Sequence, residues 1–129
     1  IRVGGSSGPI DNETTWEQVR LYSDAPEAMP EYTSVTHRLR RVALFDVEFI
    51  KTACKYNMPT GLAVMGLDRI DYANYKVARY QDLTQKAKGF IEMLETETGV
   101  PVQIIGTGFG TGDAIKLPVR TVAPQYDYA

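Results

Sequence analysis

The pattern of hydrophobic and polar positions predicts little regular structure in the first 36 residues. Turn-forming residues dominate residues 4–9 (GGSSGP) and 23–32 (SDAPEAMPEY). Between these turns the stretch NETTWEQVRLY predicts one short helix. Asn12 or Thr14 can cap its start, and Glu17 follows Thr14 at the spacing of a capping box.

Residues 33–45 (TSVTHRLRRVALF) predict an extended segment that runs into a helix. Asp46 can cap that helix, because its side chain can accept hydrogen bonds from the first free N–H groups. The sequence Asn-Met-Pro at residues 57–59 ends the helix. Between these limits hydrophobic residues recur at helical spacing, at Val47, Ile50, Ala53 and Cys54.

The remainder of the chain alternates strands and helices. Residues 60–68 (TGLAVMGLD) form an apolar run typical of a buried parallel strand. A helix is predicted from about Asp82 to Thr98, with Gly99 as its C-cap. Its apolar stripe consists of Ala87, Phe90, Ile91 and Leu94.

Two further strands are predicted, VPVQIIG and AIKLPV, on either side of a glycine-rich loop. This order predicts an α/β fold, part of a mostly parallel sheet with flanking helices. Residues 69–81 show no pattern that assigns them, and residues 119–129 form a polar tail, either a surface strap or disordered.

Composition and charge narrow the function classes. The 129 residues amount to about one domain, 43% hydrophobic, with a net charge of −2 that does not favour a nucleic-acid binder. The single cysteine, Cys54, excludes an intramolecular disulfide and a cysteine-cluster zinc site. The sequence contains no apolar run long enough for a membrane span and no signal peptide, so we expect a cytoplasmic protein. It begins IRVGG without methionine, which suggests a fragment, a processed product or a trimmed chain.

The glycine-rich stretch IIGTGFGTGD (residues 104–113) does not match phosphate-binding patterns. Thr111 and Asp113 occupy the positions of the third glycine in G-x-G-x-x-G, and the chain has no Gly-Lys pair. A strand follows the loop, whereas a phosphate site needs a helix N-terminus there. Two interpretations remain: the backbone contacts the edge of a purine base, or the loop is a tight β-turn without a ligand.

Three further positions carry candidate chemistry, each with a simpler alternative. Arg38 and Arg40 lie on one side of an extended segment, where they form either a paired anion site or a solvated basic edge. His37 beside them is more typical of a packing or hydrogen-bonding residue than of a catalyst. Asp68 follows an apolar strand, where it either accepts hydrogen bonds from a guanine edge or caps the next turn.

Four stretches, in this order, resemble the C-terminal part of the adenylosuccinate synthetase family. VTHRLRRVALFD resembles the segment T-T-G-R-x-R-R-x-G-W-x-D, and GLAVMGLDRID resembles the strand and base-recognition motif T-K-L-D-x-L-D. FIEMLETETGVPVQIIGTGFGTGDAIKL resembles the closing stretch I-E-x-L-x-G-V-P-x-x-I-I-S-T-G-P-D-R. IRVGGSSGP with ETTWEQ is closer to the phage branch, which attaches aspartate to dGMP on the way to 2-aminoadenine DNA. The resemblance covers residues 1–118.

The resemblance implies a ligation in two steps. A nucleoside triphosphate phosphorylates the purine 6-oxygen of IMP or dGMP, and the amine of L-aspartate then displaces that phosphate. For aspartate and the acceptor nucleotide it implies a binding set of Ser34, Val35, Thr36, His37, Arg38 and Arg40, with Val3 and Gly4 near the acceptor ribose. For the donor nucleotide it implies Arg40, Gly66, Leu67, Asp68, Gly106, Thr107 and Gly108.

Departures from the family pattern bear on the substrates. Gly66 replaces a lysine expected to stack on guanine, Gly106 replaces a serine, and Phe109 replaces a proline. The loss of the lysine makes ATP or dATP possible co-substrates besides GTP. His37 replaces a glycine, which adopts positive φ more readily than histidine does.

The family's phosphate loop, its catalytic aspartate and histidine and its Mg²⁺ ligand have no counterpart in the 129 residues. We therefore expect no catalytic residue and no metal ligand in this chain, and no activity from it alone. The rest of the enzyme would lie in a longer chain or a second polypeptide, and the family suggests a homodimer when intact. The alternative is a non-catalytic nucleotide-binding or interaction module derived from the family.

Overall fold

The computed structural model describes residues 1–3 and 7–122, and these build two small sheets with three α-helices. The first sheet is antiparallel, in the order β1-β3-β2. The second has the order β4-β5-β6, with β4 and β5 parallel and β6 antiparallel to β5. The strands are β1 (Arg2–Val3), β2 (Glu13–Thr14), β3 (Arg41–Ala43), β4 (Leu62–Val64), β5 (Val102–Gly106) and β6 (Ala114–Lys116).

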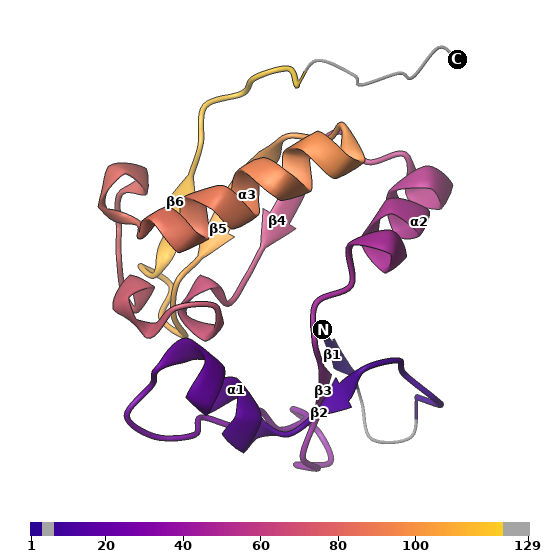
Figure 1. Ribbon diagram of the computed structural model, residues 1–129, viewed down its shortest axis with the longest axis vertical. Coiled ribbons are helices and arrows are strands. Elements are labelled where there is room, and N and C mark those ends of the chain that lie inside the picture. The colour runs from indigo at the N-terminus through magenta and orange to yellow at the C-terminus, as the bar shows by residue number, and fades with distance from the viewer. Residues whose placement is uncertain (4–6, 123–129) are drawn as a thin grey trace.

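The helices are α1 (Trp16–Ser23), α2 (Val47–Asn57) and α3 (Gln85–Thr98). Figure 1 shows α3 lying across the second sheet, α1 beside the first sheet, and α2 at the edge of the molecule. The α/β prediction is confirmed. The expected mostly parallel sheet is wrong for the described strands, because the first sheet is antiparallel and the second is mixed, with β4 and β5 as the one parallel pair.

Helix α1 forms where a helix was expected, but its cap differs from the prediction. The N-cap is Thr15, whose side chain accepts a hydrogen bond from the backbone N–H of Gln18. Asn12 and Thr14 do not cap it, because Thr14 pairs with Val42 in the sheet and Asn12 adopts a positive φ of 56°. Strand pairing thus holds the preceding residues extended and moves the cap one residue along the chain.

Helix α2 begins and ends as predicted. The Asp46 carboxylate accepts hydrogen bonds from the N–H groups of Glu48 and Phe49, and Met58 ends the helix in the left-handed conformation. The expected helical stripe buries none of its residues fully. Contact with α3 is limited to partial packing and an ion pair of 3.4 Å between Lys51 and Glu97.

Helix α3 and the second sheet enclose the main core. Gly99 ends the helix with a φ of 68°, as predicted, whereas the start is Thr84 and not Asp82. Phe90 of the predicted stripe is half-buried and contacts Phe45 edge-on at 4.8 Å between ring centroids. The buried hydrophobic residues of this core are Leu67, Leu83, Ala87, Ile91, Leu94, Val102, Ile105 and Ile115.

Strand β4 is parallel, as expected, but it is not a buried strand. Ala63 is exposed, and Leu62 and Val64 are half-buried. A continuous apolar run predicts cover on both faces, whereas α3 covers one face of this sheet.

The unassigned residues 69–81 lie within a run of three short 3-10 turns held together by one buried side chain. The turns are η1 (Leu67–Arg69), η2 (Tyr72–Asn74) and η3 (Tyr80–Asp82). Asn74 is fully buried, and its amide bonds the N–H of Thr84 at 2.8 Å, the Thr84 hydroxyl and the Asp71 carbonyl. Side-chain hydrogen bonds, which leave no periodic pattern, therefore set this segment. Among the described residues no helix is long and apolar enough to cross a membrane.

Candidate functional site

The parallel pairing of β4 and β5 brings two distant motifs together where both strands end. The N–H of Gly66 donates to the carbonyl of Gly106 at 3.1 Å. Leu67 and Asp68 follow one strand and Thr107 and Gly108 the other, so six of the seven residues predicted to contact the donor nucleotide form one group, and Arg40 lies outside it. We call Gly66–Asp68 with Gly106–Gly108 the strand-end cluster. The carboxyl ends of parallel strands are the edge at which open α/β sheets bind ligands.

Thr107 anchors the glycine loop (residues 106–113) to the molecule. Its side chain is fully buried, and the hydroxyl donates to the carbonyl of Val77 at 2.8 Å. Its backbone N–H donates to the carbonyl of Asp113, and its carbonyl accepts from Lys76. The start of the loop is therefore fixed, and Thr107 is a structural residue whatever else it contacts.

The far side of the loop is a tight turn. The N–H of Asp113 donates to the carbonyl of Gly110 at 3.0 Å, and the Asp113 carboxylate accepts from the N–H of Gly110 at 2.9 Å. A Cβ at Gly106 would overlap the Met65 sulfur, and one at Gly108 would lie 2.5 Å from the Asp113 carboxylate. Residues 110–113 thus form a tight turn, and a side chain at either of the two glycines would displace Met65 or Asp113.

Asp68 is the buried acidic group of the cluster. It lies inside η1 and not at its cap, so it does not fill the turn-capping role that was one of its two interpretations. Its exposed fraction is 5%, and burial raises the pKa of its carboxyl above the ordinary value. The nearby Arg69 guanidinium opposes this effect on the pKa. A carboxylate left with little solvent favours a ligand that donates hydrogen bonds to it.

The arginine segment forms a hairpin, not a continuous extended run. In this arginine hairpin (residues 31–40) Tyr32 pairs with Leu39, and the N–H of Arg40 donates to the carbonyl of Glu31 at 2.8 Å. The turn bends because the Thr33 hydroxyl lies 2.7 Å from that of Thr36 and accepts from the N–H of Arg38. Ser34, Val35, Thr36, His37 and Arg38 are all exposed at its tip.

His37 adopts a φ of 51°, in the left-handed region. This fits the expectation drawn from the family, in which glycine stands at this position. Its side chain is exposed, so the packing role expected for a lone histidine is not found. Its N–H donates to the carbonyl of Thr33, which closes the turn.

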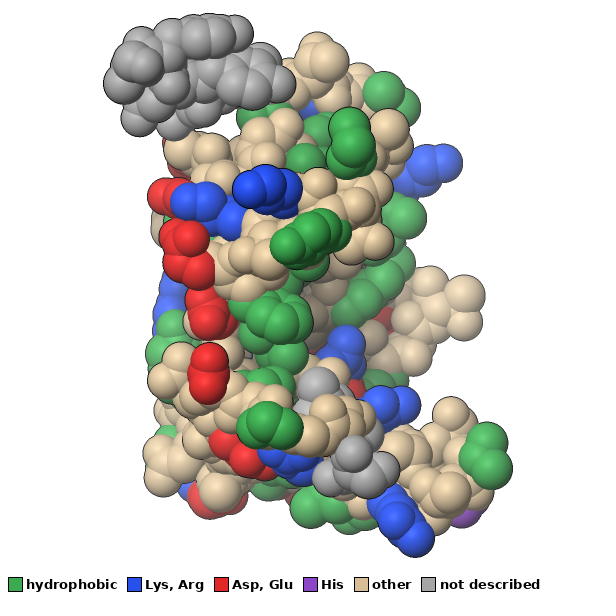
Figure 2. Space-filling model, turned by 90° about the vertical axis from the view of Figure 1, so that its right-hand side faces the viewer, with side chains coloured by type: hydrophobic (Ala, Val, Ile, Leu, Met, Phe, Trp, Pro, Cys, Tyr) green, Lys and Arg blue, Asp and Glu red, His purple; other side chains and the backbone are tan. Residues whose placement is uncertain are grey.

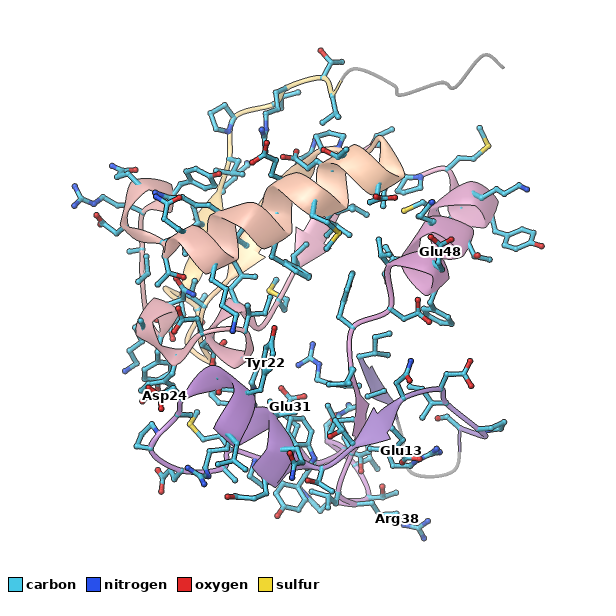
Figure 3. All side chains as sticks on the ribbon, viewed as in Figure 1. Glu13, Tyr22, Asp24, Glu31, Arg38 and Glu48 are labelled. Atoms are coloured by element: carbon cyan, nitrogen blue, oxygen red, sulfur yellow. The ribbon has the colours of Figure 1, made fainter. Side chains whose placement is uncertain are left out.

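The remaining predicted residues divide between the two parts of the molecule. Arg38 points away from the molecule in Figure 3, whereas Arg40 is half-buried at the base of the hairpin. Neither forms an ion pair with another described residue. Val3 pairs with Arg41 in the first sheet, and Gly4 lies outside the described residues. Hydrogen bonds at the hairpin tip stay within the hairpin, so the structure does not bring that tip to the strand-end cluster.

A residue that sequence reasoning missed lies between the N-terminal part of the molecule and the glycine loop. Arg69, in the unassigned segment, lies between the rings of Trp16 and Phe109 and faces the Glu31 carboxylate. In the part of the chain that the structure describes, no three His, Cys, Asp or Glu side chains form a group that could hold a metal ion.

Comparison with known proteins yields relatives of one kind. The chain is 43% identical over 107 residues to the adenylosuccinate synthetase of Methanocaldococcus jannaschii, matching 83% of this chain and 29% of that protein. It is 40% identical over 116 residues to the same enzyme of Methanosphaera stadtmanae, matching 90% of this chain and 32% of the relative. The chain thus spans about a third of the length of the curated relatives it matches. No protein-family model matches it.

A solved structure has the same fold. It is that of fully ligated adenylosuccinate synthetase from Plasmodium falciparum, with a TM-score of 0.73 and 15% sequence identity. The similarity covers 92% of this chain and 38% of that one. This likeness establishes the α/β fold.

Proposed function

This chain is homologous to a segment of the adenylosuccinate synthetase family, and on that premise we propose that it supplies substrate-binding surfaces to a purine-nucleotide:aspartate ligase. The observation that carries the proposal is the strand-end cluster. Two motifs that lie far apart in the sequence meet there through the Gly66–Gly106 hydrogen bond. The sequence relatives supply the reaction class.

The strand-end cluster is the proposed site for the base of the donor nucleotide. Buried Asp68 would accept hydrogen bonds from the N–H groups on the edge of the base. Gly106 and Gly108 would contact the base through the loop backbone, once the Met65 and Asp113 side chains that lie against them have moved aside. Gly66 offers no side chain for stacking, and on that ground we propose ATP or dATP beside GTP as co-substrates.

The arginine hairpin is the proposed binding element for L-aspartate and the acceptor nucleotide. Thr36 and Arg38 would bind the aspartate carboxylates, and Arg40 would lie between aspartate and the triphosphate. Guanidinium groups suit this role because they keep their charge and bind carboxylates through two parallel hydrogen bonds. The tip has to approach the strand-end cluster for this to happen, so we propose that the hairpin moves when substrates bind.

The proposed reaction has two steps. The terminal phosphoryl group of the triphosphate moves to the 6-oxygen of the purine, which releases the diphosphate. The aspartate amine then forms a bond to C6, the C6–O bond breaks, and phosphate leaves as the amine loses a proton. The described residues do not fit a Mg²⁺ site, and we assign no step to a metal in this chain. We propose that Mg²⁺, the phosphate-binding residues and the acid–base residues belong to the family's remaining two-thirds, in the same polypeptide or in a second one.

The acceptor is proposed as IMP or dGMP, the latter on the resemblance of residues 1–9 and 13–18 to the phage branch. The intact enzyme is proposed to be a homodimer. A non-catalytic nucleotide-binding or interaction module derived from the family is the second candidate.

A ligase assay tests the proposal. The chain is combined with the family's remaining segments, and the succino-nucleotide formed from IMP or dGMP is measured by mass spectrometry with GTP, ATP and dATP in turn. We expect product from the assembly and none from the chain alone. Arg40→Met should lower kcat/KM by about 100-fold or more, as expected for the loss of a charged hydrogen bond of about 3 kcal/mol.

The matched control is Arg79→Met, because Arg79 is exposed and pairs with Asp82 in its own turn. This variant should retain full activity. An assembly that binds nucleotide but forms no product with either acceptor would contradict the ligase and support the binding module. An assembly that binds no nucleotide would contradict both.

A further inference from the structure

Arg69 lies at the contact between the strand-end cluster and the N-terminal part of the molecule. Its guanidinium carbon is 5.0 Å from the centre of the Trp16 ring and 5.5 Å from that of Phe109. Trp16 begins α1, and Phe109 belongs to the glycine loop. One planar cation therefore touches aromatic rings from both parts, a geometry that arginine favours.

The polar edge of the same guanidinium faces Glu31. Nη2 of Arg69 lies 3.5 Å from Oε1 of Glu31, and this nitrogen is buried without a hydrogen bond. Oε1 also accepts a hydrogen bond of 2.6 Å from Arg2. Because N–H···O hydrogen bonds are usually shorter than about 3.2 Å, a small shift of either group would complete the bond. The contact is thus one that can tighten.

Trp16 and Glu31, two of the three residues that Arg69 faces, also hold the backbone of Arg40. The N–H of Arg40 donates to the carbonyl of Glu31 at 2.8 Å, and its carbonyl accepts from the indole N–H of Trp16 at 2.8 Å. Figure 3 shows Glu31 close to α1, between that helix and the first sheet. The base of the arginine hairpin is therefore fixed by the two residues that Arg69 contacts.

The stem of Arg69 touches the cluster as well. Its Cγ lies 3.3 Å from the position that a Cβ on Gly66 would take. Gly66 in turn bonds Gly106 at the start of the glycine loop. Arg69 thus lies beside Gly66 of the cluster through its stem and beside Phe109 of the glycine loop through its guanidinium group.

We propose that Arg69 is a positioning residue that couples the glycine loop to the arginine hairpin. A base bound at the strand-end cluster displaces Phe109, the guanidinium follows that ring, and Trp16 and Glu31 carry the shift to Arg40. Occupation of the donor site then favours the hairpin position that holds aspartate. The inference rests on the proposed function, which supplies the two ligands.

Amide hydrogen exchange on the chain without ligands tests the physical link. Phe109→Ala removes a ring from the glycine loop and leaves every hydrogen bond of Arg40 in place. It should nevertheless raise the exchange rate of the Arg40 amide by about two- to fivefold, the range for losing one cation–π contact. Val119→Ala, at an even more exposed residue outside the glycine loop, is the control and should leave that rate unchanged. An unchanged rate in Phe109→Ala would overturn the coupling.

Ligand binding to the active assembly tests the consequence. The dissociation constant of ATP is measured with and without saturating L-aspartate, and the ratio gives the coupling. We expect a ratio of about five or more in the parent protein and about one in Arg69→Met, with both ligands still bound. Arg69→Lys keeps the positive charge but lacks the planar guanidinium group. It should give a ratio between those of Arg69→Met and the parent protein.

The outcomes distinguish failure of the coupling through Arg69 from failure of the proposed function. An unchanged ratio in Arg69→Met, with lower thermal stability, would make Arg69 a structural residue and overturn the coupling alone. Failure of the parent assembly to bind any of GTP, ATP and dATP would contradict the proposed function, and the exchange experiment would then still decide whether the two elements are linked.

Discussion

At the scale of single residues, the candidate site holds two residues in unfavourable states. Asp68 is a carboxylate with 5% exposure, and His37 adopts a backbone conformation that glycine adopts more readily. Each lies in a segment expected to meet substrate. Local strain or desolvation that persists in a folded protein is typical of binding sites, where the ligand supplies what is missing.

Asp68→Asn should stabilise the protein at neutral pH. Burial raises the pKa of Asp68 in the folded state, so folding favours the protonated form. The buried charge destabilises the native state above that raised pKa, and the penalty fades as pH falls towards the ordinary aspartate value near 4. Thermal unfolding from pH 7 down to pH 3 should therefore show a higher Tm for the variant at pH 7 and equal values at low pH.

An equal or lower Tm for Asp68→Asn at pH 7 would mean that a neighbouring cation compensates the buried charge. Asp82→Asn, at a largely exposed residue, serves as the control for loss of one carboxylate.

His37→Gly and His37→Val should differ in stability by about 1–2 kcal/mol, the usual cost of the left-handed conformation for a residue with a side chain. Val is expected to be the less stable variant, because β-branched residues tolerate positive φ poorly. Urea unfolding measures the difference. The same two substitutions at Arg38, which lacks a positive φ, should not reproduce that order.

At the scale of elements, the glycine loop owes its position to one threonine. Thr107 is buried and bonds two segments, through Val77 and Asp113. The loop therefore starts at an anchored residue and ends in a tight turn.

Thr107→Val should lower the free energy of unfolding by about 1–3 kcal/mol, because it leaves the Val77 carbonyl without the hydroxyl that donates to it. It should also weaken nucleotide binding, since the loop loses its anchor. Thr107→Ser keeps the hydroxyl and should retain most of both. Loss of stability without weaker binding would show that the anchor and the binding surface are independent.

Elements that carry their own signals were predictable, and those set by distant partners were not. Helix α3 was predicted from its apolar stripe and Gly99, and α2 from Asp46, because caps and periodicity are local. The cap at Thr15 was missed because β2 pairs with β3. The site shows the same difference. The motifs that resemble the family named the residues of the strand-end cluster, whereas no local sequence pattern predicts the contact of Arg69 with Trp16.

At the scale of the whole molecule, apolar surface remains open on α2. Phe49 and Tyr56 are 60% and 82% exposed on one face of this helix, and Met58 follows them. Figure 2, which views the molecule from this side, shows hydrophobic side chains open to solvent between charged ones. Contiguous exposed apolar surface commonly marks a contact with further protein.

The double variant Phe49→Ser, Tyr56→Ser should reduce self-association of the chain. Sedimentation at increasing concentration should give an average mass nearer 14.4 kDa than the parent does, with little change in Tm because neither side chain is buried. Thr52→Ser with Lys55→Ser changes polar residues of the same helix and is the control. A parent that sediments as a monomer at every concentration would contradict the prediction.

The sheet pairings also bear on how the chain folds. Every pairing of the first sheet lies within residues 1–43, and every pairing of the second lies within residues 62–116. Each sheet joins strands far apart in sequence, so each has to close a long loop before its contacts form, which slows folding. The two sheets share no strand, so the pairings of the first sheet need no residue of β4, β5 or β6. The first sheet can therefore form before β5 has been synthesised.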